Sequence, residues 1–172
     1  MRFYSAQECE EWLTGRGRMK PEMAPGNLGE RICYLPTPGR ILHYAHWIAS
    51  NITYRMPTLL WITERGNWHE NWHLYYKLRQ SYNDNRLLLE APGHLLLDYE
   101  TEDLASLLQL AMLNGWGGYI LTEADYVNAF FSHDEYIDFF ASHESKLADV
   151  REALGEKPAA QTLAPDPISG DN

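Results

Sequence analysis

The sequence predicts an α+β fold, in which about five helices pack on a mixed, largely antiparallel sheet of about five to six strands. Short apolar runs rich in β-branched and aromatic residues alternate with segments of helical periodicity. Several of these runs are joined by short turns, whereas parallel strands would need longer crossover connections. The chain has 172 residues, of which 45% are hydrophobic, so one domain can bury a core of its own.

The first element is expected to be a short helix. Ser5 and Glu8 have the spacing of a capping box, in which each side chain accepts a hydrogen bond from the backbone N–H of the other residue. The predicted helix runs to about Leu13. Residues 15–30 contain four glycines and two prolines, which indicates a loop. Residues 32–35 are then expected to form a short buried strand.

A second helix is expected from Thr37 to about Asn51. Thr37 can cap a helix, and Pro38 suits the first helical position because no hydrogen bond is lost there. Residues 58–63 are predicted to form a strand, since they are apolar, β-branched and aromatic. A third helix is predicted to begin at about Asn67.

Two leucine runs are predicted to pair as an antiparallel hairpin. They occupy residues 87–89 and 95–97. Pro92 and Gly93 lie between them and suit the two central positions of a type II turn.

The next segment predicts a helix followed by two strands. The helix is expected from Thr101, with acidic residues in its first turn where the helix dipole favours them, to Asn114. Strands are predicted over residues 118–121 and 126–131. The glycines that precede the first strand are expected to allow a close approach of the backbone.

A second capping-box spacing, Ser132 with Glu135, predicts a final helix that runs to about Leu154. In this interpretation His133, Asp134 and Glu135 form the first helical turn and are not an acid/base cluster. From residue 157 the chain is rich in proline and poor in apolar residues, which predicts a disordered tail over 157–172 after a single globular domain at 1–156.

The charge balance limits the classes of partner. The chain has 14 basic and 24 acidic residues, a net charge of −10, which disfavours nucleic acid and anionic membranes and favours a basic protein. No apolar run reaches the ~20 residues of a membrane span, and the acidic N-terminal segment does not resemble a signal peptide. Cys9 and Cys33 have no paired spacing and are expected to be free, buried thiols of a cytoplasmic protein.

The segment from His69 to His73 carries the motif His-Glu-x-x-His. It resembles the signature of the zinc metallopeptidases called zincins, in which the two histidines bind zinc and the glutamate activates water. The resemblance implies zinc on His69 and His73, with Glu70 as the general base. An alternative function is therefore a small zinc-dependent hydrolase.

The flanking residues favour a simpler interpretation of this motif. On a helical projection Trp68 and Trp72 lie on one side, and the two histidines lie on the opposite, hydrophilic side. Asn67 and Glu70 also have the spacing of a helix cap, and no third zinc ligand can be assigned. The leading expectation is a helix start without metal or cofactor.

Aromatic residues are the remaining functional signal, because the chain has six tryptophans and eleven tyrosines. Aromatic side chains with acidic neighbours are typical of protein interfaces. We expect Trp68, His69, His73 and Trp116 to form a binding surface. The predicted function is a non-catalytic, acidic, cytoplasmic binding protein, for example an inhibitor or immunity-like protein that neutralises a basic protein partner.

Overall fold

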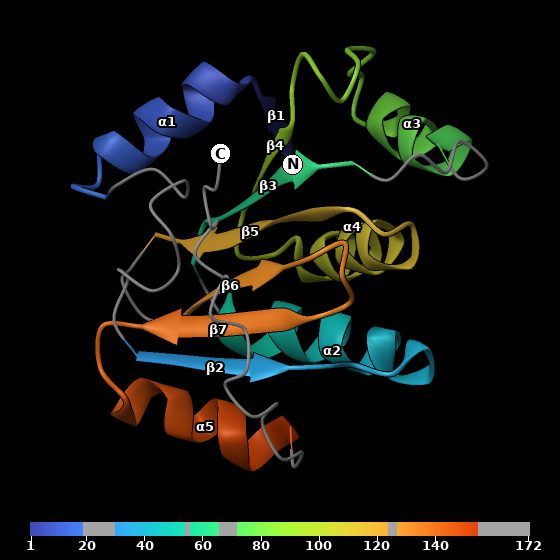
Figure 1. Cartoon of the computed structure of the whole chain (residues 1–172). Helices are drawn as coiled ribbons and strands as arrows, with labels where there is room; N and C mark the ends of the chain where they lie inside the picture. Colours follow the sequence, from blue (N-terminus) through green and yellow to red (C-terminus); the bar gives the residue numbers. More distant parts are fainter. Residues whose placement is uncertain (19–29, 54–55, 66–71, 124–126, 155–172) are drawn as a thin grey trace, which may run out of the picture.

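Seven described strands form one antiparallel sheet in the computed structural model, in the order β1-β4-β3-β5-β6-β7-β2 (Figure 1). The structure describes residues 1–18, 30–53, 56–65, 72–123 and 127–154. The strands are β1 (Arg2–Tyr4), β2 (Glu30–Tyr34), β3 (Thr58–Glu64), β4 (Gly93–Leu96), β5 (Gly117–Thr122), β6 (Asn128–Phe131) and β7 (Ile137–Ala141). The predicted α+β class is confirmed, with a larger sheet than expected.

Helices cover both faces of the sheet. They are α1 (Ala6–Thr14), a 3-10 turn η2 (Pro38–Arg40), α2 (Ile41–Trp47), a π-helical turn η3 (Ile48–Ile52), α3 (Trp72–Ser81), α4 (Thr101–Leu113) and α5 (Ser145–Leu154). In Figure 1, α2 and α4 lie together behind the sheet, while α1 lies beside β1 and β4. No helix among the described residues is long and apolar enough to cross a membrane.

The alternation of side chains along β3 divides the core between the two faces. Leu60 and Ile62 join the larger cluster, which holds the apolar sides of α2, α4 and α5. Leu59 and Trp61 point the other way and join the smaller cluster under α1, as the period of two in a strand requires. Gly93 of β4 allows α1 to pack closely against the sheet, since a Cβ at this position would lie 2.2 Å from Cys9 Sγ.

Several predicted elements are confirmed. Ser5 and Glu8 form the predicted capping box: the Glu8 N–H donates to Ser5 Oγ at 3.2 Å, and the Ser5 N–H donates to Glu8 Oε2 at 2.6 Å. The predicted strand at 58–63, the helix beginning at Thr101 and the two strands before Ser132 also form. These segments share strong local signals that agree with the tertiary packing.

The predicted hairpin between residues 87–89 and 95–97 is wrong. Residues 87–90 form a turn, in which the Leu87 N–H donates to Glu90 Oε2 and the Ala91 N–H donates to the Leu87 carbonyl. Strand β4 instead pairs with β1 on one side and β3 on the other. Both edges of β4 are therefore used by strands that lie far away in the sequence.

The helix predicted from Ser132 is also wrong over its first half. Ser132 Oγ accepts from the Asp134 N–H, and the Ser132 N–H donates to the Tyr136 carbonyl, which closes a turn between β6 and β7. Glu135 has φ = 65°, outside the helical region. Strand β7 pairs with β6 and with β2, so sheet pairing prevails over the local cap. Only α5 forms as a helix.

A buried charged network joins α3 to β4. Arg79 is fully buried, and its guanidinium donates to the Tyr75 hydroxyl at 2.7 Å, the Ala91 carbonyl at 3.0 Å and Asp84 Oδ1 at 2.7 Å. The Tyr75 hydroxyl lies 2.8 Å from His94 Nε2, and His94 Nδ1 lies 3.3 Å from the Leu60 carbonyl. Burial costs a charge several kcal/mol unless it is paired, and these bonds supply the pairing.

The two cysteines are free. Cys9 is buried and Cys33 is half-buried, so the expectation of two buried thiols is confirmed in full only for Cys9. Burial raises the pKa of both thiols to about 12, and Asp138 adds to this at Cys33. Neither thiol is activated as a nucleophile at neutral pH.

Candidate functional site: a groove beside the β6–β7 turn

The histidine motif falls largely outside the described residues. Trp68, His69 and Glu70 belong to the segment that the structure does not describe, so the proposed zinc pair stays a prediction. His73 is exposed on α3, as expected from the helical projection. Among the described ranges, no group of three histidine, cysteine or acidic side chains is arranged to hold a metal ion.

Trp116 does not lie on an accessible surface. It is fully buried between α4 and β5, with ring centroids 5.3 Å from Tyr75 and 5.9 Å from Trp72 in edge-on contacts. The sequence predicted that Trp116 contributes to a binding surface. The structure instead places it in the core, where the aromatic side of α3 covers it. Such aromatic contacts stabilise a core, and here they attach α3 to the sheet.

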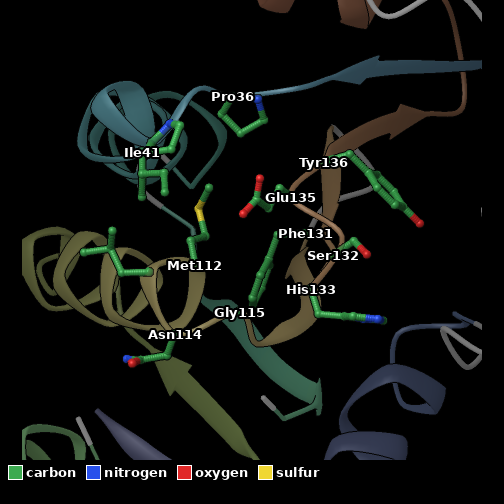
Figure 2. A pocket seen from close by; sticks show the side chains of 12 residues that line it. Pro36, Ile41, Met112, Asn114, Gly115, Phe131, Ser132, His133, Glu135 and Tyr136 are labelled. Atoms are coloured by element: carbon green, nitrogen blue, oxygen red, sulfur yellow. The ribbon is translucent and has the colours of Figure 1, made fainter. Parts of the chain in front are cut away.

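A groove of about 390 Å³ lies at one end of the sheet (Figure 2). It lies where three connections meet: the start of α2, the end of α4 and the turn between β6 and β7. Its wall combines apolar and polar side chains, namely Pro36, Pro38, Ile41, Met112, Leu113, Asn114, Gly115, Phe131, Ser132, His133, Glu135 and Tyr136. We call it the β6–β7 groove.

A second hollow, of about 510 Å³, lies between η3 and α5. Its charged lining residues, Lys146, Asp149 and Glu152, include both signs, so the hollow does not select for one charge. The β6–β7 groove differs because no lysine or arginine is among its described lining residues.

Glu135 supplies the carboxylate of the β6–β7 groove. Figure 2 shows its carboxylate directed into the space between Pro36 and Met112, whereas the rings of His133 and Tyr136 point away from α2 and α4. The side chain is exposed, and no described residue forms a hydrogen bond or ion pair with its carboxylate. Among the described residues it is a negative charge without a partner, beside an apolar wall.

The backbone of Glu135 is strained. Its φ of 65° places an L side chain in the left-handed region, which costs about 1–2 kcal/mol for residues other than glycine, asparagine or aspartate. Glycine or asparagine would fit this turn better on conformational grounds. Strained backbone positions cluster at functional sites, so this residue choice is consistent with a use for the carboxylate.

His133 connects the same turn to the end of β3. Its Nδ1 lies 2.6 Å from Glu64 Oε2 at the end of β3, and its Nε2 lies 3.3 Å from Asp134 Oδ1. Gly117 makes room for this pair, since a Cβ there would lie 2.4 Å from Glu64 Oε2. The hydrogen bond that His133 donates to Glu64, with the charges of Asp134 and Glu64, raises the pKa of His133.

The arrangement around His133 favours charge pairing over acid/base catalysis. A carboxylate lies beside each ring nitrogen, so neither nitrogen is directed at a serine, cysteine or water-binding position as a general base requires. Glu64, Asp134 and Glu135 carry three negative charges against one on protonated His133. The end of the groove is therefore negative.

One exposed leucine lines the groove, and two more are next to lining residues in the chain. Leu113 lines it and is 57% exposed, while Leu35 and Leu42, at 59% and 48%, adjoin Pro36 and Ile41 in sequence. We call these three residues the leucine rim. The C-terminal end of α4 adds partial negative charge at the same place.

The sequence interpretation missed this site because it assigned His133 to Glu135 to a helix. The serine-to-glutamate spacing was a strong local signal for that assignment. The alternation in residues 137–141, where Ile137, Phe139 and Ala141 face one core and Phe140 the other, was the signal for a strand. Because residues 137–141 form a strand, Asp134 and Glu135 lie in the turn that joins β6 to β7.

Comparison with protein-family models, with curated proteins and with solved structures finds no match for this chain.

Proposed function

We propose that the protein is a non-catalytic binding protein that recognises a basic protein partner through the β6–β7 groove and its leucine rim. The observation that carries the proposal is the Glu135 carboxylate, which has no partner in the described part of the chain and lies beside an apolar wall, in a chain with a net charge of −10. Opposite charge would speed the encounter, and the leucines would supply apolar contact area. An inhibitor or immunity-like role in the cytoplasm fits this mode of action.

Apolar and acidic groups lie side by side at this surface. Interface centres are apolar and their surroundings are polar, with hot-spot residues near the middle. Ile41 and Met112 give the groove apolar lining, and the lining residue His133, paired with Asp134 and Glu64, adds polar groups. A basic surface that presents an apolar patch would match both parts.

The test uses the immobilised full-length protein to capture partners from the cells that produce it. Each captured protein is purified and titrated calorimetrically against the wild type and the double variant Leu35→Ser/Leu113→Ser. We expect a basic partner whose affinity falls about tenfold or more in this variant, as for interface hot spots. Leu89→Ser is the matched control, because Leu89 is 65% exposed and is not a groove residue.

Three results would contradict the proposal: capture of no basic partner, equal affinity of the double variant and the wild type, or an equal loss in the control. Circular dichroism of all variants verifies that folding is retained. Raised salt is expected to lower the association rate constant and to change the dissociation rate constant less, because it screens the charges that steer the encounter.

The zinc hydrolase stays the alternative function and rests on the histidine motif alone. Its two ligand positions are not both among the described residues, so its support is the resemblance of the motif. Metal analysis distinguishes it from the binding function, as set out in the Discussion.

A further inference from the structure

We propose that the β6–β7 groove receives a single arginine side chain of the basic partner, with the guanidinium on the Glu135 carboxylate and the aliphatic stem on the apolar wall. This inference rests on the proposed function and names the group that the groove recognises. It is carried by the order of the groove's apolar and charged surfaces and by the absence of lysine and arginine among its described lining residues.

The groove has room for one long side chain. Its volume of about 390 Å³ lies within the range for small-ligand pockets, which is about 300–1,000 Å³. A single long side chain that enters from the partner's surface would occupy part of the groove, while the leucine rim contacts the surrounding backbone.

The order of surfaces along the groove matches a long cationic side chain. Ile41, Met112 and Pro36 form an apolar wall, and the Glu135 carboxylate lies against it (Figure 2). Arginine and lysine bury their methylene stems on such walls while the charged head reaches a polar partner. A purely apolar side chain would leave the carboxylate without a partner.

The electrostatics select a cation. Glu135 has no described partner of its own, and the groove ends at the C-terminus of α4, where the helix dipole is negative. His133, the one lining residue that can carry positive charge, is already paired with Glu64 and Asp134. An anionic side chain would meet repulsion here.

Arginine fits better than lysine. Its planar guanidinium is more weakly hydrated than an ammonium, so less is lost when it enters a partly apolar groove. It can also bind a carboxylate through two parallel hydrogen bonds and still offer donors to the carbonyl oxygens around the groove. Met112 and the other apolar side chains can make van der Waals contact with the guanidinium plane.

The test is an NMR titration of the ¹⁵N-labelled full chain with N-acetylarginine amide. We expect shifts of the amide signals of Ile41, Met112 and Glu135. N-acetylcitrulline amide, which has nearly the same shape without the charge, should bind about tenfold more weakly, because its neutral N–H groups donate to the carboxylate without the attraction of opposite charges. N-acetyllysine amide with its free side-chain amine should fall between the two.

Two variants give the matched comparison. Glu135→Gln keeps the side-chain length and should reduce arginine-amide binding about tenfold, whereas Glu102→Gln, at the opposite end of α4, should leave it unchanged. The inference is overturned if arginine amide does not shift the groove signals. It is also overturned if citrulline amide binds equally well, or if Glu135→Gln has no effect.

The two proposals can fail separately. If a basic partner loses affinity in Leu35→Ser/Leu113→Ser but not in Glu135→Gln, the surface is the interface and the arginine pocket is wrong. If arginine amide binds the groove in a Glu135-dependent way and no basic protein is captured, the pocket stands and the proposed function is wrong.

Discussion

The Tyr75 hydroxyl lies 2.8 Å from Nε2 of His94 in the interior of the protein, with Arg79 Nη1 2.7 Å from the same hydroxyl. With the Tyr75 hydroxyl as donor to Nε2, His94 is a neutral imidazole whose remaining proton on Nδ1 points to the Leu60 carbonyl. This relationship connects α3, β4 and β3 through polar groups that are all buried. It makes the stability of the fold sensitive to one proton.

Acid is expected to destabilise the protein through His94. Burial, with the nearby charge of Arg79, lowers the pKa of His94 to about 3 from its usual value of 6.5. Between these pH values the unfolded chain binds a proton that the folded protein does not. Stability should therefore rise with pH from about 3 to 6.5, by a His94 contribution on the order of 1.4 kcal/mol per pH unit, and then level off.

Urea unfolding at a series of pH values measures this dependence. His94→Gln should flatten the slope between pH 3 and 6.5, whatever its effect on stability at neutral pH. His46→Gln changes an exposed histidine and should keep the wild-type slope. An identical slope in His94→Gln would show that other groups cause the acid sensitivity.

Loss of the buried guanidinium is expected to be costly. Arg79→Met removes the donor to Tyr75, Asp84 and the Ala91 carbonyl. Asp84 keeps its bonds with Arg86 and the Tyr75 hydroxyl keeps His94, so the Ala91 carbonyl loses its donor and unfolding free energy should fall by about 1–3 kcal/mol. Arg151→Met breaks an exposed pair with Glu144 and should cost less than about 1 kcal/mol. Equal effects in chemical denaturation would contradict the stabilising role of the buried network.

The turn that carries Glu135 is expected to become more stable when its strain is relieved. Glu135→Asn places a residue that tolerates positive φ at this position and should raise unfolding free energy by about 0.5–1 kcal/mol. Glu135→Gln removes the same charge without relieving the backbone and should leave stability nearly unchanged. Thermal and urea denaturation of the three proteins provides the comparison, and a gain of equal size in both variants would assign the effect to charge.

The histidine motif makes a separate prediction. If His69 and His73 bind zinc, purified protein should contain about one zinc per chain, and His73→Ala should lose it. His43→Ala, at an exposed histidine of α2, is the control and should keep the metal. Elemental analysis decides the matter: stoichiometric zinc that depends on His73 would overturn the non-catalytic binding function, and metal-free protein would remove the hydrolase.

Local signals predicted an element correctly where its neighbours in space agreed with them. The capping box at Ser5 begins α1, the apolar run at 58–63 lies in the centre of the sheet as β3, and the helix from Thr101 ends at Leu113. In each case the residue pattern alone leaves one element type that buries the apolar side chains. No distant partner had to be known.

Prediction failed where distant strands competed with a local signal. The Leu87 run has strand composition, yet both edges of β4 are taken by β1 and β3, so no edge is left for it. Ser132 has the spacing of a helix cap, yet β6 and β2 both pair with the segment that follows. The hydrogen bonds of a sheet depend on residues far along the chain, which a local pattern does not contain.

The sequence by itself determined the α+β class, the acidic character and several helix and strand positions of this protein, because these depend on composition and local periodicity. Only the tertiary structure decided that Trp116 is core and that the Glu135 carboxylate lies in a groove. Burial and pairing are properties of where side chains meet. The turn at Glu135 becomes a candidate site only when β7 pairs with its neighbours and brings α2 and α4 alongside.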